Sequence, residues 1–267
     1  YYELIRMVGA VPVVLDATEA SHFKLTAEQL SAAITPRTKA LILNNPSNPT
    51  GMVYSREELQ AIGRVCVEKD IYVIADEIYY HLIYDGKTFT SFPSVSEEVK
   101  ERTILINGVS KSYAMTGWRI GYAAANEQIA KVMSNYLSHS TAAPCSIAQK
   151  AAVAALDGSY DCVEEMRLSF LRRRDMAMKE IATWPGVVCN RPGGAFYLFP
   201  DVSALFTPEM SSGEAVCAML LEKARVACVP GEAFGDPNCI RLSYAVADDV
   251  LMDALRRMKE ALYGGKA

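Results

Sequence analysis

Apolar segments of strand length alternate with amphipathic helices through the first part of the chain, and this alternation limits the folds open to it. Two expected helices begin at capping boxes, in which Thr26 pairs with Gln29 and Ser55 with Glu58. Strands that are apolar along their whole length are buried on both faces. The pattern predicts an α/β fold with a mostly parallel sheet sandwiched by helices. The expected strands are 11–15, 39–43, 71–75, 103–106 and 120–124.

A further helix over 128–139 carries its apolar residues on one face. The pattern then changes near residue 158, where a long charged helix over 160–183 is expected. Shorter strands and helices follow it, which predicts a smaller C-terminal α+β domain. We therefore expect a large domain at 1–158, an interdomain helix at 159–183 and a small domain at 184–267. The expected elements of the small domain are strands 195–199, 226–229 and 240–244 and helices 212–224 and 248–262.

The charge balance argues against two classes of partner. The 27 Lys and Arg residues nearly balance 31 Asp and Glu residues, for a net charge of −4. This charge balance does not indicate binding to nucleic acid or to an anionic membrane. No apolar stretch approaches the roughly 20 residues that span a bilayer. The seven cysteines contain no CxxC pair, which favours reduced thiols in the cytoplasm over a disulfide framework or a metal site.

The chain begins at Tyr1, and its first residues read as the middle and end of a helix closed by Gly9 at its C′ position. We therefore expect a longer native chain. Several common enzyme signatures are also missing from the sequence. There is no G-x-G-x-x-G after a strand, no G-x-x-x-x-G-K-[ST], no H-E-x-x-H and no G-x-S-x-G. The sequence therefore lacks the motifs of dinucleotide-binding proteins, P-loop proteins, metallohydrolases and serine hydrolases.

The strand at 71–75 runs into Asp76, Glu77, Ile78 and Tyr79. Asp76 is therefore expected at the carboxyl edge of a parallel sheet, where open α/β folds bind ligands, and close to buried. A buried carboxylate needs a cation or strong donors, and a protonated pyridine nitrogen is one such partner. Alternatively, Asp76 caps the next element and Tyr79 is a packing residue.

The next strand, 103–106, leads to a lysine among small and apolar residues, Lys111. Burial lowers the pKa of a lysine, which would make Lys111 a usable amine nucleophile. Ser110 and Arg119 flank it with a hydroxyl and a guanidinium, which suit a phosphate. The alternative is a turn with a solvated lysine and an arginine in a surface ion pair.

Two further polar residues stand out in apolar or turn-rich surroundings. Asn48 lies in a rigid loop that follows the strand at 39–43, and its amide can donate and accept hydrogen bonds. Arg241 lies inside an apolar strand, where its fork of donors fits a substrate carboxylate. Asn48 can also be read as part of a bare turn, and Arg241 as an edge-strand residue that faces water.

Taken in order, five motifs resemble those of the class I/II aminotransferases, which are pyridoxal phosphate enzymes of fold type I. The resemblance runs from Gly9 to the final helix, and it is the ordered set that is specific. The motifs are Asn-Pro-Ser-Asn-Pro-Thr-Gly at 45–51, Ala-Asp-Glu-Ile-Tyr at 75–79, Ser-Lys-Ser-Tyr-Ala-Met-Thr-Gly-Trp-Arg-Ile-Gly-Tyr at 110–122, Gly-Ala-Phe-Tyr at 194–197 and Ile-Arg-Leu-Ser-Tyr at 240–244.

The resemblance implies a role for each candidate residue. Lys111 would form the aldimine with pyridoxal 5′-phosphate and then move the proton during transfer. Asp76 would pair with the pyridinium nitrogen, and Tyr79 would donate to the phenolic oxygen of the cofactor. The remaining residues would bind the cofactor or the substrate: Ser110 and Arg119 the phosphate, Asn48 the phenolic oxygen and the substrate carboxylate, and Arg241 the α-carboxylate.

The implied activity is transfer of an amino group from an α-amino acid to a 2-oxo acid by a ping-pong mechanism. The resemblance also implies a homodimer, and it implies an N-terminal segment, absent from this sequence, that supplies further phosphate and ring contacts. Three other readings stay open: a carbon–sulfur β-lyase on the same scaffold, a cofactor-binding sensor joined to a DNA-binding module, and an inactive fragment. Gly117-Trp-Arg119 favours transfer over elimination.

Overall fold

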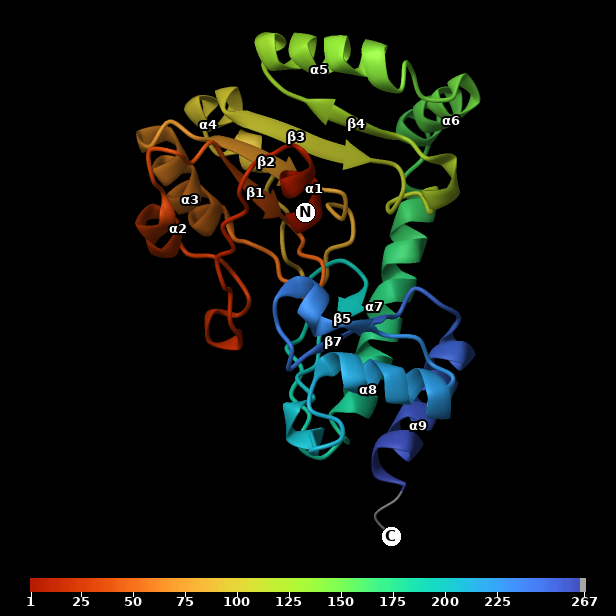
Figure 1. Cartoon of the computed structure of the whole chain (residues 1–267). Coiled ribbons are helices and arrows are strands. Elements are labelled where there is room, and N and C mark those ends of the chain that lie inside the picture. The colour runs from red at the N-terminus through yellow and green to blue at the C-terminus, as the bar shows by residue number, and fades with distance from the viewer. Residues whose placement is uncertain (265–267) are drawn as a thin grey trace. The chain divides into compact units, whose positions relative to one another are not determined.

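The computed structural model describes residues 1–264, which form two compact units (Figure 1). Unit 1 comprises residues 1–46, 54–81 and 88–160, and unit 2 comprises 47–53, 82–87 and 161–264. The two short segments of unit 2 come from the part of the sequence that was expected to form the first domain. Each unit is therefore assembled from segments that are not contiguous in the chain.

Unit 1 contains a four-stranded sheet in the order β1-β2-β3-β4. β1 and β2 are parallel, as are β2 and β3, while β4 runs antiparallel to β3. The predicted α/β fold with a mostly parallel sheet is confirmed, and the strand ends differ from the expected ones by a few residues. The strands are β1 (Ala40–Asn44), β2 (Tyr72–Asp76), β3 (Thr103–Gly108) and β4 (Gly121–Ala124).

The prediction of a strand at 11–15 is wrong. This segment has no regular secondary structure and pairs with no strand among residues 1–264, and Val11 and Val13 are exposed. β-branched residues favour extended backbone, but a strand also needs a neighbour to bond to. Pro12, which has no N–H to donate, further weakens any ladder at this point.

The helices of unit 1 begin where the sequence places their caps. The Thr26 hydroxyl accepts from the backbone N–H of Gln29 at 3.2 Å, and the Ser55 hydroxyl accepts from the N–H of Glu58 at 3.2 Å, so both predicted capping boxes form. The α-helices are α1 (Tyr2–Met7), α2 (Ala27–Ala33), α3 (Arg56–Glu68), α4 (Glu97–Glu101), α5 (Glu127–Ser140) and α6 (Ser146–Asp157). Short 3-10 turns lie at η1 (Glu19–Ser21), η2 (Phe92–Ser94) and η3 (Thr116–Trp118).

Gly9 ends α1 in the way its position in the sequence predicts. Its backbone has φ +76°, and its N–H donates to the carbonyl of Arg6 at 2.9 Å. The N–H of Ala10 donates to the carbonyl of Ile5 at 3.1 Å. This pair of bonds is a Schellman motif, which a glycine at C′ accommodates without steric cost.

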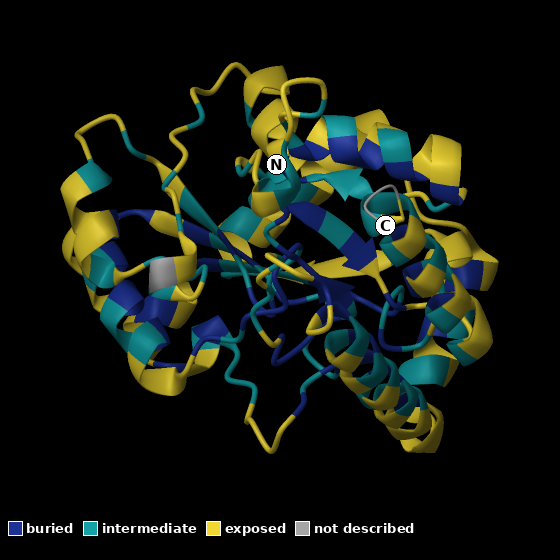
Figure 2. Ribbon diagram, turned by 90° about the horizontal axis from the view of Figure 1, so that it is seen from below, coloured by how far each residue is buried: buried dark blue, intermediate teal, exposed yellow. Residues whose placement is uncertain are grey.

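One apolar core joins α2 and α3 to the strands β1 and β2. The inward residues of α3 follow helical spacing at Leu59, Ile62 and Cys66, and they meet the buried side chains of Leu43 and Val73. Complete burial of an aliphatic side chain of this size stabilises the fold by about 1.5–3 kcal/mol. Figure 2 shows the buried residues concentrated along the strands, with exposed residues on the outer sides of the helices.

The expected burial of the sheet on both faces is not met at β4, whose four residues are all exposed. α5 has no buried residue, and its apolar face is largely open: Val132 is 67% and Tyr136 is 73% exposed. The periodicity of α5 is therefore helical as expected, but nothing within residues 1–264 covers its apolar face.

Within the described residues, unit 2 contains a small antiparallel sheet in the order β5-β7-β6 and three α-helices. The strand that was expected at 226–229 is shorter in the structure and begins later in the chain. The strands are β5 (Tyr197–Leu198), β6 (Val229–Pro230) and β7 (Ile240–Ser243), and the α-helices are α7 (Asp161–Ile181), α8 (Gly213–Met219) and α9 (Asp248–Tyr263). A π-helical turn, η5 (Leu220–Ala224), continues α8, and 3-10 turns lie at η4 (Ser203–Leu205) and η6 (Gly231–Phe234).

A fully buried arginine on α7, Arg174, ties the segment 82–87 into unit 2. Its Nη1 and Nη2 each donate to the carboxylate of Asp85 at 2.7 Å, and its Nε donates to Asp175 at 2.9 Å. The guanidinium also donates to the carbonyl of Pro192 at 2.8 Å. These hydrogen bonds compensate for the burial of the Arg174 guanidinium. The bonds from Arg174 to Asp85 also hold the pKa of Asp85 down at about 2.

Candidate functional site

Asp76 is the last residue of β2, in register with Asn44 of β1 and Ile106 of β3. Since the carboxyl ends of parallel strands meet at one edge, this places the carboxylate where an open α/β sheet binds ligands. Asp76 is half-buried, which corrects the expectation of near-complete burial. Its carboxylate accepts from the backbone N–H of Ile78 at 3.2 Å and from the hydroxyl of Tyr1.

Tyr1 was not predicted to be a site residue. Burial raises the pKa of the Tyr1 phenol, and the hydrogen bond to Asp76 raises it further, far above its ordinary value. The phenol therefore stays protonated and acts as a donor that orients the carboxylate. The partners are 75 residues apart, so no local pattern could have indicated the contact.

Two residues that follow Asp76, Glu77 and Tyr79, are buried. Tyr79 is buried, with 4% of its surface exposed. Glu77 is also buried and accepts from the backbone N–H of Phe92 at 2.7 Å. Burial raises the pKa of Glu77 to about 7, far above that of an exposed glutamate. Glu77 was not singled out from the sequence, although it lies next to Asp76 in the motif.

Lys111 and Ser110 follow β3 and are half-buried, so Lys111 is less enclosed than its neighbours in the sequence suggested. Arg119 precedes β4, is exposed, and donates from Nη1 to the carbonyl of Thr116 at 2.8 Å. It has a left-handed backbone, with φ 53°, at the end of η3.

A pair of glycines aligns these two segments. Gly108 of β3 is in register with Gly121 of β4, two residues before Ser110 and two after Arg119. A Cβ on Gly108 would lie 3.0 Å from Cα of Gly121 and 3.2 Å from the carbonyl oxygen of Ile120. A Cβ at Gly108 would therefore force the two strands to shift by a few tenths of an ångström. The close pairing of Gly108 with Gly121 brings the segment that carries Ser110 next to the segment that carries Arg119.

Unit 2 brings Asn48 and Arg241 into contact although 193 residues separate them. Nη1 of Arg241, on β7, donates to Oδ1 of Asn48 at 2.8 Å. The loop of Asn48 is fixed at Gly51, whose carbonyl accepts from the N–H groups of Gly193 and Gly194 at 2.9 Å. Gly51 has φ +67°, and a Cβ there would lie 2.4 Å from Cβ of Pro192. A glycine is therefore required at this position.

The predicted site residues thus form two sets, one in each unit. Asp76, Tyr79, Ser110, Lys111 and Arg119 lie at or just beyond one edge of the sheet of unit 1, and Asn48 and Arg241 are in contact in unit 2.

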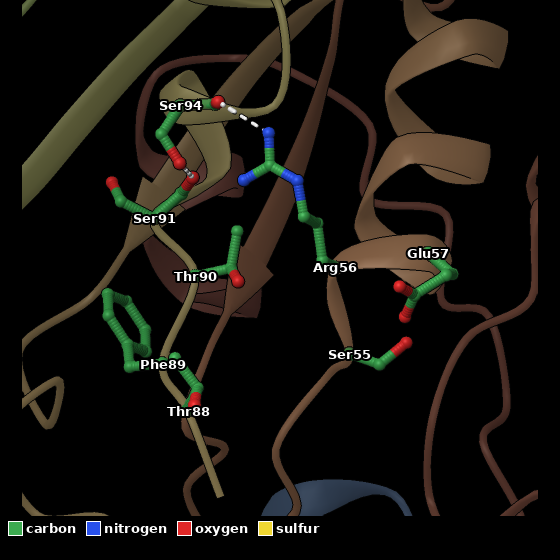
Figure 3. A pocket seen from close by; sticks show the side chains of 8 residues that line it. All are labelled: Ser55, Arg56, Glu57, Thr88, Phe89, Thr90, Ser91 and Ser94. Atoms are coloured by element: carbon green, nitrogen blue, oxygen red, sulfur yellow. Dashed lines mark hydrogen bonds between the residues drawn. The ribbon is translucent and has the colours of Figure 1, made fainter.

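A surface pocket of unit 1 shares none of these residues (Figure 3). It lies between the start of α3 and the loop at 88–94, and Nη2 of Arg56 donates to the carbonyl of Ser94 at 3.4 Å on one side of it. The pocket therefore does not define the candidate site. It is lined by Ser55, Arg56, Glu57, Thr88, Phe89, Thr90, Ser91 and Ser94.

The sheet, with an acid and a lysine at the ends of neighbouring strands, is that of an α/β protein whose ligand site lies at the carboxyl edge. Comparison with known proteins identifies the family. The aminotransferase class I and II family matches residues 1–258, and the chain belongs to this family.

The chain is similar to an aspartate aminotransferase of Geobacillus stearothermophilus, with 48% identity over 97% of this chain and 66% of that protein. Among solved structures, it resembles an aspartate aminotransferase from Rhizobium meliloti, with 40% identity and a TM-score of 0.94 over 98% of this chain and 67% of that one. It also resembles an aromatic aminotransferase from Pyrococcus horikoshii OT3, with 37% identity and a TM-score of 0.94 over 100% of this chain and 70% of that one. The chain thus spans about 66% of the length of the curated relative.

Proposed function

We propose that this protein is a pyridoxal phosphate-dependent aminotransferase that moves an amino group from an α-amino acid to a 2-oxo acid. The observation that carries the proposal is the position of Asp76 and Lys111 in a chain of this family. Asp76 ends β2 and Lys111 follows the neighbouring parallel strand β3, so a carboxylate and an amine are available at one edge of the sheet.

The residues of unit 1 fit the cofactor by their chemistry. Pyridoxal phosphate has a ring nitrogen that can be protonated, a phenolic oxygen, an aldehyde and a phosphate. Asp76, oriented by Tyr1 and by the N–H of Ile78, offers a carboxylate to the nitrogen. Tyr79 offers a phenol to the oxygen, and Lys111 offers an amine to the aldehyde. Ser110 and Arg119, on adjoining turns, offer a hydroxyl and a guanidinium to the phosphate.

When bound, the cofactor supplies a carbonyl that links to amines and a ring that takes up the electrons released at the Cα atom of the substrate. Asp76 would stabilise the charged ring nitrogen, which would make the ring a better electron acceptor. Lys111 would hold the cofactor through its amine. Once a substrate amine had replaced it, the free amine of Lys111 would be available as the base and acid for the proton at the substrate Cα.

The α-carboxylate of the substrate is bound by Arg241 and Asn48. Both residues act in each half of a ping-pong reaction, because the amino acid and the 2-oxo acid carry the same carboxylate. The names of similar proteins lead us to propose aspartate as the first amino donor to test and an aromatic amino acid as the second.

We also propose a homodimer in the cytoplasm with no membrane or nucleic-acid partner. The seven cysteines contain no CxxC pair, which favours reduced thiols. No helix within residues 1–264 has the length and apolar character needed to cross a membrane. As a functional division, we propose a cofactor domain drawn mainly from residues 1–158, a connecting helix at 159–183 and a small domain after it.

The test is the visible absorption of the protein after addition of pyridoxal phosphate. We expect a band from the cofactor linked to Lys111, its absence in Lys111→Ala, and its retention in Lys131→Ala, which removes an exposed lysine of α5. Aspartate or an aromatic amino acid should bleach the band, and a 2-oxo acid should restore it. An unchanged band in Lys111→Ala would refute the assignment, and release of ammonia and pyruvate would indicate elimination instead of transfer.

A further inference from the structure

The guanidinium of Arg241 contacts two aromatic rings in addition to Asn48. Its central carbon lies 4.5 Å from the ring centroid of Tyr197 and 5.0 Å from that of Phe234. Tyr197 belongs to β5 and Phe234 ends η6, so both rings come from segments other than the one that carries the arginine. The structure thus surrounds the charge with ring surfaces from two further parts of unit 2.

The partners of Arg241 differ from those of Arg174, the fully buried arginine of the same unit. Arg174 is neutralised by Asp85 and Asp175. Within residues 1–264, Arg241 forms no ion pair with a carboxylate, and its Nη1 donates to the neutral amide of Asn48. Its Nε is buried and has no hydrogen-bond partner in this part of the chain.

Aromatic rings and carboxylates stabilise a cation in different ways. A carboxylate occupies the N–H donors of a guanidinium and cancels its charge. A ring attracts the cation through its electron-rich face and leaves the N–H donors available. Rings therefore suit an arginine that must bind an incoming carboxylate, whereas an acidic partner would compete with that ligand.

We propose that Tyr197 and Phe234 are positioning residues that orient Arg241 for the carboxylate shared by the amino acid and the 2-oxo acid. This inference rests on the proposed function. The rings restrict the rotamers of the long arginine side chain before the ligand arrives, so less conformational entropy is lost on binding. Asn48 accepts from Nη1 and fixes the guanidinium from a further direction; in the proposed arrangement, Nη2 donates to the ligand.

The test replaces each ring by leucine in one variant and by another aromatic ring in a second variant. We expect Phe234→Leu and Tyr197→Leu to raise KM for both the amino acid and the 2-oxo acid by about 3- to 30-fold, with kcat nearly unchanged, because the contact is the same in the ground and transition states. Phe234→Tyr and Tyr197→Phe keep a ring and should keep KM near the wild-type value. The matched control is Phe170→Leu, which removes a buried ring that contacts Phe196 and Tyr244.

A second readout needs no turnover. Succinate, which cannot react, should bind the cofactor-free protein more weakly in the leucine variants, by a similar factor in Kd measured by calorimetry. Phe234 is half-buried, so Phe234→Leu carries the test if Tyr197→Leu does not fold. Unchanged KM and Kd in Phe234→Leu, or an equal loss in Phe170→Leu, would overturn the inference. Absence of amino transfer in the wild type, with succinate binding still dependent on the rings, would refute the proposed function alone.

Discussion

Two adjacent carboxyl groups, Asp76 and Glu77, have different environments at the end of β2. Asp76 is half-buried and held by Tyr1 and the N–H of Ile78. Glu77 is buried and bonded to the N–H of Phe92, at the start of η2. The first is placed to meet a ligand, whereas the second joins the end of the strand to the loop that follows.

The raised pKa of Glu77, about 7, gives a prediction for stability. The folded state keeps the proton of Glu77 at pH values at which the unfolded chain has lost it. The contribution of Glu77 is therefore fully present below the unfolded pKa near 4.5 and is lost as pH rises through about 7. Glu77→Gln keeps an acceptor for Phe92 without a charge, so it should stabilise the cofactor-free protein at pH 8 by about 1–3 kcal/mol and change little at pH 4.

Urea denaturation at several pH values measures this effect, and Glu68→Gln, at an exposed position of α3, is the control. A Glu77→Gln variant whose stability relative to the wild type is the same at pH 4 and pH 8 would mean that Glu77 does not keep its proton in the folded state.

At the scale of elements, the close pairing of β3 and β4 determines where Ser110 and Arg119 lie. We expect Gly108→Ala to separate the strands, because its Cβ would meet the backbone of Gly121 and Ile120 at 3.0 and 3.2 Å. The cost in stability should be about 1–3 kcal/mol, typical of overpacking. Affinity for pyridoxal phosphate should fall about tenfold or more, since about 1.4 kcal/mol of lost phosphate binding has that effect.

Gly117→Ala provides the control for this experiment. It lies in the same motif, and a Cβ there would meet no atom within 4 Å. Fluorescence titration with the cofactor and thermal unfolding compare the two variants. If both lose affinity equally, the loop composition and not the strand pairing positions the phosphate ligands.

The elements that could be predicted from the sequence are those specified by local patterns. The apolar strands β1, β2 and β3 and the capping boxes of α2 and α3 need only neighbouring residues to be recognised. The segment 11–15 has the composition of a strand but no partner, and pairing is a property of the fold. An element whose formation depends on pairing with a distant segment could not be predicted from local patterns.

The same distinction applies to the candidate site. Asp76 and Lys111 could be placed at the sheet edge from strand order alone. The contact of Asn48 with Arg241 and that of Tyr1 with Asp76 join residues 193 and 75 positions apart, and no periodicity encodes them. The motifs indicated the residues that we propose to carry the chemistry, but not the side chains that contact them.

For the whole molecule, the two units do not follow a single cut in the sequence. The segments 47–53 and 82–87 lie between strands of unit 1 but pack in unit 2. Gly51 and Leu82 accept hydrogen bonds from the chain at 193–195, and Asp85 pairs with Arg174. The change in sequence pattern predicted a domain boundary near residue 158. It could not show that loops leaving the sheet of one unit would pack in the other unit.

Unit 1 also exposes apolar side chains that a monomeric protein normally covers. Among residues 116–157 they include Val132 at 67%, Tyr136 at 73% and Ile147 at 71% exposure, on α5 and α6. Large exposed apolar patches promote association in water, and a net charge of −4 provides little repulsion to oppose it. We therefore predict that the 267-residue chain self-associates through this part of its surface.

Light scattering over a range of protein concentrations measures the effect. The mean mass of the wild type should rise with concentration, and the double variant Val132→Lys/Ile147→Lys should reduce that rise without lowering the melting temperature, because neither side chain is packed in a core. Val250→Lys is the matched control, since Val250 is 51% exposed on α9 of unit 2. If the control reduces association as much as the double variant, added charge explains the result, and the apolar side chains of α5 and α6 are not what holds the copies together.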